Sequence, residues 1–234
     1  MYILSSWGIG MIENANFLCE IGTEEIPAGY CAPAMEALQK AFGEKLPEKR
    51  IAYTDIDVCA TPRRIAFFVS GMADAQSEEE VEIKGPSTKA AYDAQGNPTK
   101  ALDGFLKGNA VKREDVFTVR TDKGEYVYAR KRMTAGRTED ILPSILDEVI
   151  KGLPFPKRMR WSDKSISFPR PISYFMILFN DRIVPFEMDG IASSNMTRGH
   201  YVRFNRMIRI DRIREFESVL KDNGVVINQH ERKK

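Results

Sequence analysis

The sequence predicts an α+β fold, in which mixed sheets with β-hairpins pack against helices. Apolar residues recur at helical spacing in some segments, whereas other short runs are rich in the β-branched and aromatic residues typical of strands. Two pairs of these runs are separated by short polar turns, as expected for hairpins. Because the two kinds of segment are interspersed without an internal repeat, the α+β class is favoured.

The chain has 234 residues, of which 43% are apolar and 29% are charged. This length suffices for one large domain or two small ones. No run of about 18 apolar residues is present, so we predict no membrane-spanning segment. Residues 1–16 lack the basic start of a secretory signal, and we expect them to form a flexible N-terminal extension. The cytoplasm is the expected compartment, and residues 17–234 are the expected α+β region.

The first part of the folded region is predicted to contain three strands and one long helix. A buried strand is expected over residues 17–22, and a helix over residues 31–46. The apolar stripe of this helix comprises Met35, Leu38, Phe42 and Leu46. Residues 51–58 and 63–72 are rich in β-branched and aromatic residues, which predicts two further strands.

The middle of the chain is predicted to contain an acidic segment, two helices and a hairpin. Residues 74–84 are expected to form a solvated connection or an edge strand. Thr99 is a candidate N-cap for the first helix. Residues 116–121 and 126–133 flank a polar turn and are predicted to pair as a hairpin. The second helix is expected to begin at Thr138.

Two prolines mark the best internal boundary. Pro154 and Pro156 interrupt the helical pattern, because proline cannot continue an α-helix without losing a hydrogen bond. The charge balance of the chain also changes at this point. The sequence therefore predicts two lobes, at residues 17–153 and 157–234.

The second lobe is predicted to hold a hairpin, a short helix and a last strand. Apolar runs flank Asn180 and Asp181, which indicates the hairpin turn. Asp211 is the candidate cap of a short helix that ends at Gly224. The apolar residues 225–228 are then expected to form a strand.

The charge of the chain is unevenly distributed. Residues 1–100 carry a net charge of −6, whereas residues 157–234 carry +7. The basic end is the candidate surface for an anionic partner. The alternative is an ordinary solvated surface whose charge varies by chance.

The segment Glu20–Pro27 contains three carboxylates, on Glu20, Glu24 and Glu25. They could serve acid–base chemistry or bind a cation, but a structural role is favoured, because acidic side chains are common just before a helix. Downstream, Arg63 and Arg64 could grip a phosphate. The alternative, which is slightly favoured, is that one of them pairs with a carboxylate of the acidic segment. Adjacent strand residues point to opposite faces, so both arginines cannot easily have the same role.

A basic segment with one aromatic ring follows the predicted boundary. Lys157, Arg158, Arg160 and Lys164 surround Trp161 in a predicted loop. Such cations neutralise phosphates, and an indole can stack on a base. The cations could equally be solvated, and Trp161 could be a buried anchor. Both alternatives remain open.

A series of arginines begins in the segment Thr197–His200 and continues to Arg214. Asp211 is the only acidic residue in this stretch. The series comprises Arg198, Arg203, Arg206, Arg209, Arg212 and Arg214. A surface that faces RNA is the favoured interpretation. His200 could act as a general base, but no nucleophile is paired with it, so a hydrogen-bonded structural role is expected.

Several catalytic signatures are missing from the sequence. No phosphate-binding loop, dinucleotide-binding glycine motif, HExxH motif or nucleophile elbow is present, which argues against a self-sufficient ATP site. Three well-separated cysteines, Cys19, Cys31 and Cys59, argue against a disulfide framework or a zinc ribbon. With only two histidines, a metal site is not expected.

Four of these segments occur in an order that identifies a family. EIGTEEIP (residues 20–27), ATPRR (60–64), KRMRW (157–161) and TRGH (197–200) together resemble the β subunit of bacterial glycyl-tRNA synthetase. The linking segment FPRPISYF (168–175) fits the same resemblance. The likeness covers all but the first 16 residues, and the ordered combination is far more specific than any single motif.

The resemblance implies a subunit of an α2β2 heterotetramer that attaches glycine to tRNA(Gly). In this family ATP, with Mg, is used at the α subunit, so this chain is expected to bind no cofactor. The family's β subunit is much longer, so the chain is expected to be a fragment that is inactive alone. A fold-level analogy likens the region to the B3/B4 module of the phenylalanyl-tRNA synthetase β subunit, without carrying over its editing activity.

Resemblance and charge together predict a noncatalytic tRNA-handling or assembly segment, with no catalytic residue and no metal ligand. The expected tRNA-binding residues are Lys157, Arg158, Arg160, Arg198, Arg203 and Arg63. Two alternatives remain open. The segment could be a scaffold that docks the α subunit or other β domains. It could also be an editing-like hydrolytic module, which needs an enclosed pocket around His200 or Glu20.

Overall fold

The computed structural model describes residues 14–122 and 124–232; residues 1–13, 123 and 233–234 lie outside the description. Most of the predicted N-terminal extension therefore lies outside the described residues. Its last two residues, Ala15 and Asn16, belong to the first strand. The Asn16 side chain is bound in this strand, because its amide group donates to the Met72 carbonyl at 2.8 Å and its oxygen accepts from the Met72 N–H at 2.9 Å.

The chain divides into two compact units. Unit 1 comprises Met1–Gln76 and Gly136–Lys234, and unit 2 comprises Ser77–Ala135. Unit 2 is therefore inserted into the sequence of unit 1. This division differs from the two lobes expected from the prolines. Leu153 and Phe155 lie on either side of Pro154 yet belong to the same buried cluster of unit 1, so the chain passes this point without leaving its core.

Unit 1 is built on a seven-stranded, mostly antiparallel sheet with the strand order β2-β3-β1-β7-β10-β9, to which β8 adds by pairing with β7. Its strands are β1 (Ala15–Thr23), β2 (Asp55–Thr61), β3 (Arg64–Ser70), β7 (Ile172–Phe179), β8 (Arg182–Ile183), β9 (Glu187–Met188) and β10 (Ile191–Ser194). Strands β1, β3 and β7 are central and buried along nearly their whole length. Their sequences are accordingly continuous apolar runs rather than alternating ones.

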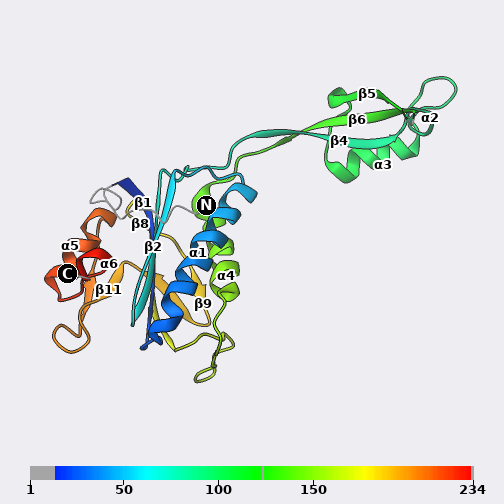
Figure 1. Cartoon of the computed structure of the whole chain (residues 1–234). Helices are drawn as coiled ribbons and strands as arrows, with labels where there is room; N and C mark the ends of the chain where they lie inside the picture. The colour runs from blue at the N-terminus through cyan, green and yellow to red at the C-terminus, as the bar shows by residue number, and fades with distance from the viewer. Residues whose placement is uncertain (1–13, 123, 233–234) are drawn as a thin grey trace. The chain divides into compact units, whose positions relative to one another are not determined.

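Two helices cover one face of this sheet, α1 (Ala28–Glu48) and α4 (Thr138–Gly152), which lie side by side in Figure 1. Phe17 of β1, Phe42 of α1 and Phe67 of β3 are fully buried and meet in this layer, with ring centroids 4.9 to 5.6 Å apart. Burying three aromatic rings in one cluster is a large apolar contribution to the stability of unit 1.

The opposite face of the sheet has a smaller core. Alternate strand residues point to opposite sides, so Leu18 and Phe68 face away from the helix layer. They pack against η3 (Ile213–Glu215) and α5 (Phe216–Asp222). The rings of Phe68 and Phe216 lie 5.7 Å apart.

A small hairpin and the C-terminal segment complete unit 1. Strands β11 (Met196–Arg198) and β12 (Met207–Arg209) pair antiparallel. Gly224 ends α5 with a φ of +76°, as the sequence predicted. The strand expected over residues 225–228 is wrong: these residues form no strand and lead directly into α6 (Gln229–Arg232).

The cap of the short helical segment also differs from the prediction. Asp211 does not cap it, because its carboxylate accepts a hydrogen bond from Arg209 at 2.7 Å. Asp181, in the tight turn between β7 and β8, instead accepts from the Ile213 N–H at 2.8 Å. A carboxylate distant in sequence thus takes the place of the local one.

Unit 2 is a three-stranded antiparallel sheet with the order β4-β6-β5. Its elements are β4 (Glu79–Ser87), α2 (Thr88–Ala91), α3 (Lys100–Asn109), η2 (Arg113–Asp115), β5 (Val116–Thr121) and β6 (Gly124–Met133). Ala91, Leu102 and Val127 form its buried core. Thr99 caps α3 by accepting from the Ala101 N–H at 3.3 Å, as predicted, and the acidic segment supplies the edge strand β4.

The α+β class, the hairpin of β5 and β6 and the three longest described helices are therefore confirmed, with boundaries shifted by a few residues. The turn at Asn180 and Asp181 also joins two paired strands, but the second of them, β8, already ends at Ile183. Among the described residues, no helix is both long enough and apolar enough to span a membrane.

Candidate functional site

A buried ion pair lies at the centre of the candidate site. Arg64 at the start of β3 donates from Nη1 to Oε1 of Glu20 on β1 at 2.8 Å. The two residues are 4% and 0% exposed, respectively. Removing two charges from water is costly, so such a pair needs further hydrogen bonds to be stable.

Neighbouring segments supply these bonds. The Tyr174 hydroxyl on β7 donates to the same Glu20 oxygen at 2.8 Å. Arg64 also donates to the Thr197 hydroxyl at 3.2 Å and to the Arg198 carbonyl at 2.6 Å. The Arg198 N–H in turn donates to the Tyr174 oxygen at 3.3 Å. One network therefore joins β1, β3, β7 and β11.

Tyr174 acts in this network as a neutral hydrogen-bond donor. Burial, with the nearby Glu20 charge, raises the pKa of Tyr174 well above its ordinary value. Gly22 gives its ring room to reach Glu20. The two residues are cross-strand partners, and a Cβ on Gly22 would lie 2.0 Å from the Tyr174 ring.

Arg63 lies beside the network but makes different contacts. It pairs with Glu24 at 2.7 Å and with Glu25 at 3.6 Å. Its guanidinium also stacks on the Tyr201 ring, 3.8 Å from the centroid. The predicted pairing with the acidic segment is therefore confirmed, and it holds for Arg64 as well as for Arg63. The carboxylates of this segment have the structural role that the sequence favoured.

His200 shapes the turn that carries Tyr201. Its Nδ1 accepts hydrogen bonds from the N–H groups of Val202 at 3.2 Å and Arg203 at 3.3 Å. An accepting Nδ1 places the proton of a neutral imidazole on Nε2, so neither nitrogen is free to act as a base. Gly199 is required beside it, because a Cβ there would lie 2.5 Å from the Phe204 carbonyl oxygen.

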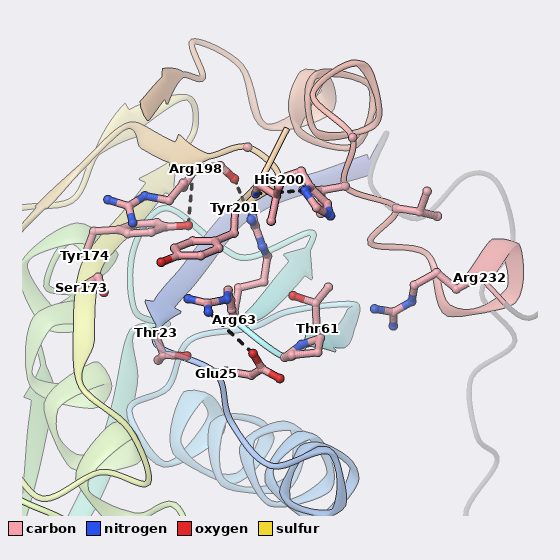
Figure 2. A pocket seen from close by; sticks show the side chains of 17 residues that line it. Thr23, Glu25, Thr61, Arg63, Ser173, Tyr174, Arg198, His200, Tyr201 and Arg232 are labelled. Atoms are coloured by element: carbon pink, nitrogen blue, oxygen red, sulfur yellow. Dashed lines mark hydrogen bonds and ion pairs between the residues drawn. The ribbon is translucent and has the colours of Figure 1, made fainter. Parts of the chain in front are cut away.

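These residues surround a pocket of about 400 Å³ (Figure 2). It is lined by Thr23, Glu25, Thr61, Pro62, Arg63, Arg64, Ser173, Tyr174, Arg198, Gly199, His200, Tyr201, Val202, Gly224, Val225, Val226 and Arg232. In Figure 2, Arg198 and Ser173 lie on one side of Tyr201, and Thr61 and Arg232 lie on the other. Four arginines, Arg63, Arg64, Arg198 and Arg232, are among the lining residues, so the pocket is suited to a ligand with acceptor oxygens.

Comparison with known proteins places the chain in a family. The profile described as "Glycyl-tRNA synthetase beta subunit" matches residues 17–234. The chain belongs to the glycyl-tRNA synthetase beta subunit family. It is 38% identical, over 92% of its length, to the glycine–tRNA ligase beta subunit of Clostridioides difficile (strain 630). It is 39% identical, over 93% of its length, to that of Desulfitobacterium hafniense (strain Y51).

The matched region is a part of these relatives. The chain spans 31% of the length of each of the two. The match includes all four segments on which the resemblance was based, and three of these segments, around Glu20, Arg63 and Arg198, meet at the pocket. This family member thus brings together segments that lie up to 178 residues apart in the sequence.

The remaining segment, KRMRW (residues 157–161), does not line the pocket. Lys157 and Arg160 are exposed, whereas Arg158 donates to the carbonyls of Lys151 and Leu153 at 2.9 and 3.0 Å, where α4 ends. Trp161 is partly buried against the core of unit 1, which supports the anchor interpretation of its side chain. Of the predicted cations, Arg63 and Arg198 therefore line the pocket, and Lys157, Arg158 and Arg160 follow α4. Arg203 is exposed in the loop between β11 and β12, outside the pocket lining.

Sequence reasoning missed three polar residues of the pocket. Tyr174 lies in a predicted strand, and nothing in its local sequence indicates a bond to Glu20, which is 154 positions away. Arg232 donates to the Ala60 carbonyl at 2.9 Å, across 172 positions. Ser173, beside Tyr174, was likewise assigned only to a strand.

The cysteines contribute no nucleophile to the site. All three are free, and burial raises the pKa of Cys19, Cys31 and Cys59, which keeps the thiols protonated. Within the described part of the chain, His, Cys, Asp and Glu side chains form no group of three that could hold a metal ion.

The buried pair yields a stability prediction. Glu20→Gln or Arg64→Met leaves the other charge buried and unpaired, so each should lower the free energy of unfolding by about 3–5 kcal/mol. The double variant should lose less than the sum of the two losses. Urea unfolding measures these losses in the free energy of unfolding. The control is Lys40→Ala, on the exposed surface of α1. Losses within about 0.5 kcal/mol of the control for both single variants would contradict the assignment.

Proposed function

We propose that this chain is a noncatalytic tRNA-handling or assembly segment of glycine–tRNA ligase, the enzyme that attaches glycine to tRNA(Gly) using ATP. Membership of the glycyl-tRNA synthetase beta subunit family supports the parent activity. Its partners are then the α subunit, in an α2β2 heterotetramer, and tRNA(Gly). ATP and Mg act at the α subunit.

The observation that carries the RNA-binding role is a set of basic residues without acidic partners. Of the six predicted tRNA-binding residues, only Arg63 forms an ion pair among the described residues. Lys157, Arg160 and Arg203 are also exposed. Unpaired, exposed cations are available to neutralise phosphates, which is the main source of affinity for nucleic acids.

The geometry of the pocket supports a noncatalytic role. Glu20 is buried and engaged by Arg64 and Tyr174, and Nδ1 of His200 is used by the turn. Neither group is placed to activate water for an editing-like hydrolysis. Glu25 is the only carboxylate among the described lining residues, and it pairs with Arg63, which supports the use of Mg and ATP elsewhere in the enzyme.

The cations after α4 test the RNA-binding role in the whole enzyme. Lys157→Ala with Arg160→Ala should weaken tRNA(Gly) binding and make the plot of log affinity against log salt shallower by about 1 for each lost phosphate contact. Arg158 is left intact, because its carbonyl contacts also stabilise the fold. Lys40→Ala, an exposed change on α1, is the matched control. Unchanged affinity and slope in the double variant would remove this role.

A second candidate function, docking of the α subunit, is favoured by the loop between β11 and β12. Its apolar side chains Tyr201, Val202 and Phe204 are 46%, 79% and 38% exposed, and Met207 at the start of β12 is 38% exposed. Exposed aromatic and methionine side chains near arginines are typical of protein interfaces. The assembly role would therefore use the tip of this hairpin.

Docking is tested by placing a charge at the tip. Val202→Asp should reduce the α subunit that co-purifies after nuclease treatment, because a carboxylate would be desolvated at the interface. Ile183→Asp, on β8, places the same charge at a side chain that is 47% exposed and serves as the control. Equal recovery of the α subunit with both variants and with the unaltered protein would exclude docking at this loop.

A further inference from the structure

Buried polar atoms without a hydrogen-bond partner gather at the pocket. Thr23 Oγ1, Arg64 Nε and Arg198 Nε belong to lining residues, and Glu20 Oε2 lies behind them. Only one other such side-chain atom, on Thr88 of unit 2, occurs in the described part of the chain. An unsatisfied buried polar group costs about 1–3 kcal/mol, so these atoms mark a place where the fold keeps polar groups at a cost to its stability.

The charges around the pocket select an anion. Arg64 is neutralised by Glu20, and Arg63 by the carboxylates of the acidic segment. Arg198 and Arg232 have no carboxylate partner among the described residues. The Arg198 side chain in particular makes no hydrogen bond to any of these residues, whereas its backbone is held on both sides by the network. A fixed backbone that presents a free guanidinium is a preorganised anion site.

The size and shape of the pocket indicate more than a simple anion. A volume of about 400 Å³ falls in the range of small-molecule sites and exceeds what an isolated phosphate needs. Tyr201 has one ring face under Arg63 and remains 46% exposed, so it offers a flat surface to a base. Ser173 is exposed and supplies a hydroxyl group at the same pocket for ribose or phosphate oxygens.

We propose that the pocket binds a single unpaired nucleotide of an RNA chain, with its phosphate on Arg198 and its base against Tyr201. The pocket chemistry itself requires only a nucleotide. That the nucleotide belongs to an RNA chain rests on the proposed tRNA-handling function.

The first test measures binding of cytidine 5′-monophosphate to the whole enzyme by calorimetry. A cytidine nucleotide avoids the ATP site expected on the α subunit. Binding should be saturable, and Arg198→Ala should weaken it at least tenfold. This variant should keep its melting temperature, because the Arg198 side chain has no described partner to lose. Lys157→Ala with Arg160→Ala, outside the pocket, is the matched control and should bind the nucleotide normally.

A second pair of variants separates the base from the phosphate. Tyr201→Leu should weaken cytidine monophosphate binding severalfold but leave competition by inorganic phosphate unchanged, because only the stacking surface is lost. Tyr201→Phe keeps the ring and should bind the nucleotide as the unaltered enzyme does. If phenylalanine is as damaging as leucine, the stacking assignment is wrong.

The outcomes separate this proposal from the proposed function. Absence of saturable nucleotide binding, or equal affinity in Arg198→Ala, would overturn the nucleotide site. If Arg198→Ala loses the nucleotide yet keeps tRNA affinity and salt slope, the pocket takes a free nucleotide and its RNA source is overturned. If Arg198→Ala weakens the binding of both the nucleotide and tRNA, the proposal stands. This conclusion does not depend on how Lys157→Ala with Arg160→Ala affects tRNA binding.

Discussion

A charged pair buried in the middle of a sheet is a constraint that the surrounding structure must satisfy. Arg64 and Glu20 are almost completely inaccessible, and their mutual attraction offsets desolvation only when the remaining donors and acceptors are bonded as well. Tyr174 and Thr197 supply such bonds from two other strands, and the Arg198 carbonyl supplies another. Glu20 Oε2 and Arg64 Nε keep no partner among the described residues. Four strands, β1, β3, β7 and β11, are thereby fixed to one point.

The candidate site follows from this fixed point. Because Arg64 holds the Arg198 carbonyl and Tyr174 binds the Arg198 N–H, the turn after β11 begins from a defined position. His200 then holds the next residues of the turn, which returns Tyr201 to stack on Arg63. The two adjacent arginines thus point to different surroundings but contribute to the same pocket.

Local features of the site and fold were predictable, and long-range ones were not. Apolar spacing predicted the central strands of unit 1 and the three longest described helices. Opposite charges in two short segments suggested the pairing of Arg63 or Arg64 with the acidic segment. The contact of Tyr174 with Glu20 depends on which strands become neighbours, which periodicity does not specify. The same limit explains why Asp181 replaced Asp211 as the cap. Prolines at positions 154 and 156 indicated a boundary, whereas the separate unit is an insertion marked by no comparable signal.

The most direct test is deuterium exchange at the backbone amides of a Glu20→Gln variant. If the ion pair positions the turn, exchange should accelerate more over residues 197–204 than over α1 and α4, whose acceleration reports only the loss of global stability. The reason is that Arg64, without its carboxylate, no longer holds the Arg198 carbonyl in place. Unchanged exchange over residues 197–204, or an equal acceleration throughout unit 1, would contradict this account.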